Sequence, residues 1–264
     1  MGVRSTVKVI TRAERKGRLT LTQPGNREWV TAIETIRADG TIIPPMIIFA
    51  GKVHISTWYD EKQLPPDWVI GLSNTGWTNN KLGITWLRDV FNKHTHNRTI
   101  GRYRLLIING HGSHLTAEFH RVCEDNLIIL LCEPAHSSHL LQSLDVSCFS
   151  VLKRVYGRMV KDWMRLGINH IDKQDFLTIY PKARMESQST TNIISAFRAT
   201  GLVPYDPDQV LSRLNILFRT LTPPLILSDR SARRGMTGKP SYENTMLFAC
   251  YRYTDLRSGS RIVL

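Results

Sequence analysis

The hydrophobic pattern of the N-terminal part indicates strands. Residues 27–36 mix β-branched and aromatic side chains, residues 38–40 (Ala-Asp-Gly) have turn chemistry, and residues 42–49 form a second apolar run. The pattern predicts a β-hairpin. Pro44 and Pro45 have no backbone N–H to donate, so we expect the second arm to be an edge strand or to begin only at Met46.

The middle of the chain alternates strand and helix patterns. Apolar residues in 80–93 recur at helical spacing, residues 104–108 and 127–132 are continuous apolar runs, and residues 116–125 fit a short helix between them. Unalternated apolar strands are typical of a parallel pair that is buried on both faces. A strand is also expected at 68–72, a long helix from about 140 to 166, and shorter helices up to about 214. The fold class is therefore α/β.

Charge points to a polyanionic partner. The chain has 264 residues and a net charge of +13, and its surface should attract nucleic acid. The alternative is that the basic balance only keeps the protein soluble. The long helix carries the basic residues that we expect to bind nucleic acid: Lys153, Arg154, Arg158, Lys161 and Arg165. No apolar run approaches the ~20 residues of a membrane span, so no membrane role is expected.

Polar residues gather after two of the predicted strands. Residues 109–114 (Asn-Gly-His-Gly-Ser-His) follow the strand 104–108, and residues 136–146 follow the strand 127–132 and open the long helix. Because ligands of α/β folds collect at the carboxyl ends of strands, we expect the two segments to meet at one edge of the sheet. The two His-x-x-His pairs could suggest zinc, but no cysteine lies at ligand spacing, and ordinary hydrogen-bonding histidines are preferred.

Several ordered motifs resemble one family. The sequence is similar to the pogo-like branch of DDE transposases, which are related to centromere protein B and common in fungal genomes. The block His-Ser-Ser-His-Leu-Leu-Gln-x-Leu-Asp-Val at 136–146 is the most specific motif, and the similarity covers roughly residues 1 to 222. The other motifs lie at 23–30, 44–52, 101–107 and 201–204.

The resemblance implies an RNase H-like mixed sheet in which three acidic residues hold two Mg²⁺ ions for DNA strand cleavage and joining. In the family, the second acid follows the buried strand and the third ends the Leu-Gln-Pro-Leu-Asp block. These positions correspond to Asn109, a substituted acid, and to Asp145, the remaining catalytic and metal-binding candidate. The family's first acidic segment, Asp-Glu-x-Gly-Phe, does not occur, and Met1 and Gly2 resemble the residues just after it. We therefore expect the first strand to be largely missing.

The resulting expectation is a transposase-derived pseudoenzyme, a domesticated transposon fragment. We expect a DDE domain over residues 1–166, a helical extension over 167–222 and a basic tail of unclear structure over 223–264. It should bind DNA without sequence preference, hold Mg²⁺ weakly or not at all, reside in the nucleus or the cytoplasm, and form a homo-oligomer if its strand edges are exposed. Two alternatives stay open: an active metal-dependent endonuclease, if the gene product extends upstream, and a protein-interaction module without a nucleic-acid role.

Overall fold

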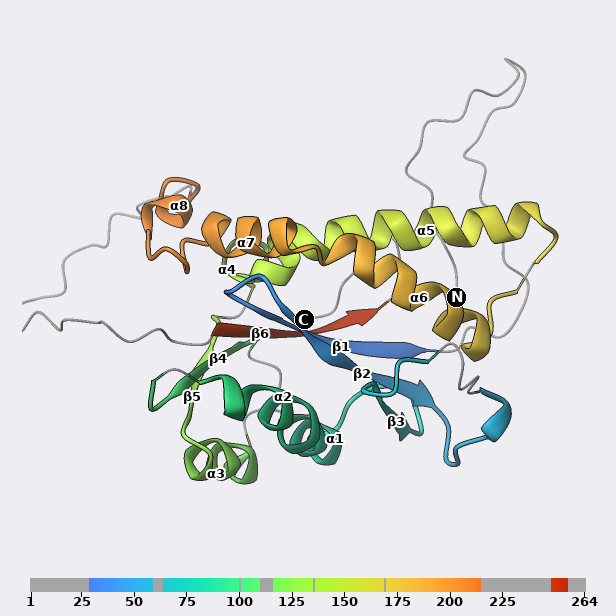
Figure 1. The fold of residues 1–264 in the computed structure, drawn as a ribbon, viewed down its shortest axis with the longest axis horizontal. Coiled ribbons are helices and arrows are strands. Elements are labelled where there is room, and N and C mark those ends of the chain that lie inside the picture. The colour runs from blue at the N-terminus through green and yellow to red at the C-terminus, as the bar shows by residue number, and fades with distance from the viewer. Residues whose placement is uncertain are drawn as a thin grey trace, which may run out of the picture.

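The computed structural model describes residues 29–58, 64–99, 101–109, 116–134, 136–168 and 170–214, together with the backbone of residues 248–255. These residues form three layers, with a twisted sheet between two groups of helices (Figure 1). The combination of strands and helices confirms the predicted α/β class.

The sheet has six strands among the described residues, in the order β3-β2-β1-β6-β4-β5. The order of strands in the sheet differs from their order in the chain, because the last strand of the chain lies between the N-terminal hairpin and the parallel pair of residues 104–132. The strands are β1 (Val30–Arg37), β2 (Ile42–Ala50), β3 (Val69–Ser73), β4 (Arg104–Ile108), β5 (Ile128–Cys132) and β6 (Phe248–Asp255).

The hairpin β1–β2 forms where the sequence predicts it. Its turn is closed by Gly40, whose φ of 85° favours glycine. A bulge lies between the pairs Ile33–Met46 and Thr35–Ile43, so it contains both prolines. Parallel pairing of β2 with β3 starts only at Met46. The strand itself begins earlier, at Ile42, and it is an interior strand. The bulge explains how two prolines are accommodated there.

Strand β6 connects the two halves of the sheet. It pairs antiparallel with β1 from Arg37–Ala249 to Thr31–Asp255, and parallel with β4 from Leu105–Phe248 to Ile108–Tyr251. The strand that was expected to be missing has a substitute in the structure, because a strand from the tail lies between the hairpin and the parallel pair. Figure 1 shows β6 in red between β1 and β4. The segment 223–264, left without a predicted structure, thus supplies a central strand.

Strands β4 and β5 form the predicted parallel pair, but β5 is not buried on both faces. Ile129 and Leu131 are 42% and 48% exposed, whereas Ile128 is buried. The physical reason is that β5 is the edge strand of the sheet, so its two faces are not equally covered.

One face of the sheet is covered by helices of the middle segment. The predicted helix at 80–93 begins at the cap residue Asn79, whose side chain accepts from the Leu82 N–H at 2.9 Å. It is continuous but changes type, from α1 (Asn80–Thr85) through the π-helical η2 (Trp86–Asn92) to α2 (Lys93–Thr95), followed by η3 (His96–Arg98). Together with α3 (Ala117–Asp125), these elements enclose a core containing Ile33, Leu106 and Ile108.

The other face is covered by the C-terminal helices. The expected helix at 140–166 is interrupted: α4 (Ser138–Leu141) ends at Gln142, whose ψ of 111° is extended, and the chain restarts as the π-helical η5 (Leu144–Cys148), which continues into α5 (Phe149–Arg165). On this face α5 packs with α6 (Lys173–Ser187) and α7 (Thr190–Ala199) over Ile36, Ile107 and Phe149. The short helix α8 (Asp208–Leu211) lies at its periphery (Figure 1), and η1 (Ser56–Trp58) contacts α6.

Candidate functional site

The carboxyl ends of β4 and β5 place two polar residues side by side. Asn109 follows β4 and Glu133 follows β5, and the Glu133 N–H donates to the Ile108 carbonyl oxygen at 2.8 Å, which extends the ladder by one step. Ile107 belongs to the core under α5, and Ile108 belongs to the core on the opposite face. Since side chains alternate along a strand, Asn109 lies on the α5 side of the sheet.

Asp145 reaches the same side from η5. Leu144, just before it, and Cys148, three residues after it, belong to the same buried cluster as Ile107 of β4. The start of η5 is fixed by a hydrogen bond between the hydroxyls of Ser143 and Thr200, 3.0 Å apart. Ser143 stands where the family has proline. Its φ of −56° is within the range that proline adopts, so serine keeps the backbone conformation of the family's proline. The two residues predicted from the resemblance, Asn109 and Asp145, are thus held on one face of the sheet.

The Asn109 side chain is buried without polar partners among the described residues. It is 4% exposed, and neither its Oδ1 nor its Nδ2 has a hydrogen-bond partner within that part of the chain. A buried amide in this condition costs about 1–3 kcal/mol, so such atoms often identify places where a ligand or ion binds. His111 and His114, from the neighbouring polar segment, lie outside the described residues.

The donor set at this position does not fit a two-Mg²⁺ centre. Asp145 is the only carboxylate at the positions matched to the family's acids, and Asn109 supplies no charge. The neighbouring strand β6 adds no carboxylate beside Asn109. Tyr251 of β6 pairs with Ile108, so the next residue, Arg252, is level with Asn109, and residues 248–254 include no acid. Within the described ranges no three His, Cys, Asp or Glu residues form a group that could hold a metal ion.

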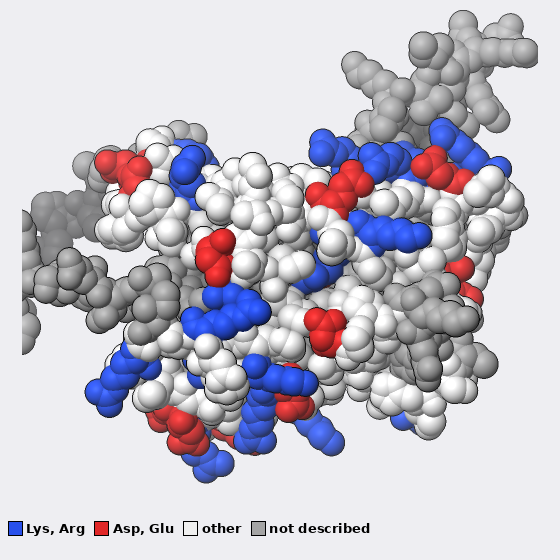
Figure 2. Space-filling model, in the orientation of Figure 1, with Lys and Arg blue, Asp and Glu red and all other residues white. Residues whose placement is uncertain are grey.

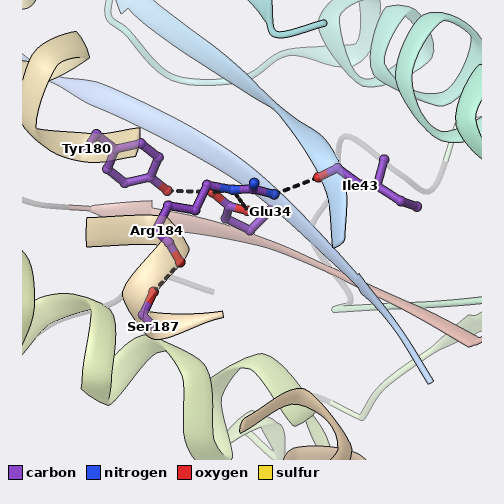
Figure 3. A network of polar contacts seen from close by, with 5 residues as sticks. All are labelled: Glu34, Ile43, Tyr180, Arg184 and Ser187. Carbon is purple, nitrogen blue, oxygen red and sulfur yellow. Dashed lines mark hydrogen bonds and ion pairs between the residues drawn. The ribbon is translucent and has the colours of Figure 1, made fainter. Parts of the chain in front are cut away.

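A second buried polar group, which the sequence analysis did not identify, lies on the same face of the sheet (Figure 3). Glu34 on β1 is fully buried and accepts hydrogen bonds from the Tyr180 hydroxyl at 2.7 Å and from Arg184 Nε at 2.9 and 2.8 Å. The Arg184 Nη2 atom donates to the Ile43 carbonyl oxygen at 2.6 Å. This network ties α6 to the hairpin. Its signal in the sequence is a glutamate that alternates with the apolar residues Ala32 and Ile36, so that it lies on their face of the strand.

The charge of Glu34 also affects a thiol near Asp145. Burial, together with the negative charge of Glu34, raises the pKa of Cys148 to about 12. The thiol therefore stays protonated at neutral pH and is a poor nucleophile. Cys148 is a packing residue of η5, and it contributes no reactive group to the site.

The predicted nucleic-acid-binding residues lie on α5. Arg154, Arg158, Lys161 and Arg165 are spaced by four, three and four residues, so they share one face of the helix. Figure 2 shows Lys and Arg side chains along this helix, at the upper right of the view, with acidic side chains among them. Arg158 donates to both carboxylate oxygens of Glu186 at 3.0 and 2.8 Å, and Arg165 pairs with Asp162 at 3.0 Å.

Pairing reduces the charge that this face presents. Arg154 is exposed, and Lys153 and Lys161 are half-buried. Further basic residues of the sequence, at 12–18 and 230–234, lie outside the described residues. The surface of α5 is thus positively charged, but the charges of Arg158 and Arg165 are partly neutralised by Glu186 and Asp162.

Comparison with known proteins assigns the family. A family model described as DDE superfamily endonuclease matches residues 26–197. The chain belongs to this family, as the motifs around Asn109 and Asp145 predict. The similarity to pogo elements is also confirmed: the human "Pogo transposable element with ZNF domain" is 23% identical over 158 residues, which are 60% of this chain and 11% of that protein.

Fungal relatives are more similar. The protein named "MFS-type transporter clz9" from Cochliobolus lunatus is 46% identical over 223 residues, 84% of this chain and 24% of the relative. "Chaetoglobosin A biosynthesis cluster protein C" from Chaetomium globosum is 41% identical over 71 residues, 27% of this chain and 17% of the relative. The chain thus spans a quarter or less of these relatives. None of the helices described here has the length and apolar character to cross a membrane. No solved structure matches.

Proposed function

We propose that the chain is an RNase H-like DDE domain that binds nucleic acid through electrostatic attraction and does not cut it. The observation that carries this proposal is the buried Asn109 at the position of the family's second acid. An amide oxygen can ligate a metal but brings no charge, and loss of one catalytic electrostatic group commonly costs about 100- to 1,000-fold in rate. With this acid replaced by an amide, two-ion chemistry has too few anionic ligands.

The sheet order supports the RNase H-like assignment. Strand β6 lies antiparallel to β1 and parallel to β4, so it has the central position that the family's first strand would take. In this proposal the DDE domain covers residues 1–166, the helices of 167–222 pack onto its α5 face, and the tail of 223–264 completes the sheet. Mg²⁺ as a catalytic cofactor and a nuclear location remain expectations from the family.

The test of inactivity is a nicking assay on supercoiled DNA. The purified chain should produce no metal-dependent nicks with Mg²⁺ or Mn²⁺. Nicking that disappears in Asp145→Ala would overturn the proposal and favour an active endonuclease.

The nucleic-acid part is tested by titrating duplexes of unrelated sequence. Binding should be weak, similar for all sequences, and should fall steeply between about 50 and 200 mM salt, because phosphate contacts release counterions. An affinity that stays constant over this range would exclude the electrostatic mechanism.

A protein-interaction role is a second candidate, and the edge of the sheet favours it. Ile129 and Leu131 of β5 expose apolar side chains beside an edge strand, a combination that promotes pairing with another chain. Sedimentation of the wild type and of Leu131→Lys tests it. A concentration-dependent oligomer of the wild type that is monomeric in Leu131→Lys would support homo-oligomer formation through β5. Monomeric wild type and variant would exclude this homo-oligomer.

A further inference from the structure

A group of exposed basic side chains lies on the segment that connects η2 with β4. Lys93 begins α2, Arg98 ends η3, and Arg102 and Tyr103 come just before β4. All four side chains are exposed, and together they are called the loop surface. We propose that the loop surface binds single-stranded nucleic acid, with its three cations on phosphates and Tyr103 on an unpaired base. This inference rests on the proposed function and adds a second binding surface to that of α5.

The cations of the loop surface are not neutralised by carboxylates. On α5, Arg158 and Arg165 are held in ion pairs. Within the described ranges, none of the ion pairs includes a cation of the loop surface. A phosphate therefore meets the full charge of these side chains without competing against an acid of the chain.

The positive potential of the loop surface also acts on a neighbouring histidine. Burial lowers the pKa of His94, and the charges of Lys93 and Arg98 lower it further, while Asp67 has the opposite effect. A nearby cation disfavours the protonated form of histidine. Because Lys93 and Arg98 act on the same ring, they lie in one small region of the surface.

Arg104 fixes the conformation of the segment that carries the loop surface. It is 4% exposed, and its Nη1 and Nη2 atoms donate to the Thr95 hydroxyl at 2.8 Å and to the Asn126 carbonyl oxygen at 2.6 Å. The Thr95 hydroxyl donates in turn to the Phe91 carbonyl oxygen at 2.6 Å. These bonds connect the start of β4 with α2 and with the end of α3. A surface that is ordered before binding loses less conformational entropy when a ligand binds.

Tyr103 adds an aromatic ring to the cations. Its side chain is 39% exposed, and the guanidinium carbon of Arg102 lies 5.2 Å from the ring centroid. Surfaces that bind single strands combine basic groups along the phosphates with aromatic rings on which bases stack. The bases of a duplex are already paired and stacked on one another, so Tyr103 favours an unpaired strand.

The loop surface and α5 lie on opposite sides of the sheet. In Figure 1, α2 is below the sheet and α5 is above it. Figure 2 shows Lys and Arg side chains around the position of α2, apart from those along α5. The contributions of the two surfaces can therefore be measured with separate substitutions.

The experiment is a titration of the full chain with a labelled oligo-dT strand and with a duplex, followed by fluorescence anisotropy over a range of salt concentrations. Arg98→Gln and Arg102→Gln should each reduce the slope of log affinity against log salt by about 0.7 for the single strand. The matched control is Arg88→Gln, which removes the same charge from η2, where Arg88 lies 3.9 Å from Glu118. It should leave the slope unchanged. Tyr103→Leu should weaken oligo-dT binding about threefold or more and leave the duplex affinity unchanged.

The outcomes separate this inference from the proposed function. Salt-dependent binding with unchanged slopes in both arginine variants would overturn the inference alone. Unchanged oligo-dT affinity in Tyr103→Leu, or an equal loss for strand and duplex, would overturn it as well. If Tyr103→Leu fails to fold, as judged by circular dichroism, the arginine variants decide. Wild-type protein that binds neither ligand in a salt-dependent way would overturn the proposed function and this inference with it.

Discussion

Two buried polar groups on the α5 side of the sheet differ in how completely their atoms are satisfied. Glu34 is fully buried, and Tyr180 and Arg184 donate to its carboxylate at 2.7 to 2.9 Å. Asn109, two strands away, is also buried, but neither of its side-chain polar atoms has a partner among the described residues. We call the group of Glu34 the closed network, because both carboxylate oxygens accept hydrogen bonds, and we call Asn109 the open group, because its amide forms none within the described part of the chain.

The difference separates stability from ligand binding. The network of Glu34 holds helix α6 on the sheet, and both of its carboxylate oxygens accept hydrogen bonds. An open polar site lowers stability and is retained where something else binds. Burial and polarity alone therefore do not distinguish the two groups, whereas the completeness of their hydrogen bonds does.

The largest expected effect comes from breaking β6, the strand that lies between the two groups. Tyr251 pairs with Thr35 of β1 and with Ile108 of β4. Tyr251→Pro removes a backbone donor from a central strand, so we expect loss of the cooperative unfolding transition or association into oligomers. Circular dichroism and sedimentation measure both.

Tyr251→Val is the matched control, because it keeps the backbone N–H and a strand-forming side chain. It should retain a cooperative transition. A proline variant that unfolds like the wild type would mean that β6 is not needed to join the two halves.

The next largest effect is expected at the closed network. Glu34→Leu leaves the Arg184 guanidinium buried without its carboxylate and should lower the free energy of unfolding by about 3–5 kcal/mol. Urea denaturation measures this. The control is Glu186→Gln, which removes the exposed pair with Arg158 and should cost about 1 kcal/mol or less. Similar losses in both variants would contradict the structural role assigned to Glu34.

The open group should respond in the opposite direction. Asn109→Leu removes an amide that is buried without partners, so it should leave the free energy of unfolding unchanged or raise it by about 1–2 kcal/mol.

Asn126 offers the matched comparison, because its amide is satisfied. Its Nδ2 donates to the Val122 carbonyl oxygen at 2.8 Å, and its Oδ1 accepts from Asn92 at 3.0 Å. Asn126→Leu should therefore destabilise the protein. Equal destabilisation in both variants would show that Asn109 has partners that stabilise the fold.

The sequence allowed local features to be predicted better than distant ones. Apolar periodicity placed the hairpin, the parallel pair and most helices, whereas the roles of Asn109 and Asp145 stay predictions from motif similarity. The network of Glu34 was missed because its partners are 146 and 150 residues away. Strand β6 was missed because a central strand is defined by its neighbours in the sheet, and the tail that contains it has no clear periodicity.

The smallest expected effect concerns DNA binding by α5, and it depends on the same distinction between satisfied and unsatisfied groups. Arg154 is exposed, whereas Arg158 on the same face is held by both carboxylate oxygens of Glu186. A phosphate has to compete with that carboxylate for Arg158 but not for Arg154. Arg154→Gln should therefore weaken DNA binding more than Arg158→Gln, and it should reduce the slope of affinity against salt by about one counterion. Glu186→Gln frees Arg158 and should strengthen binding slightly. Fluorescence anisotropy over a range of salt concentrations measures all three variants. If neither arginine changes the slope, the positive charge that binds DNA is not on α5.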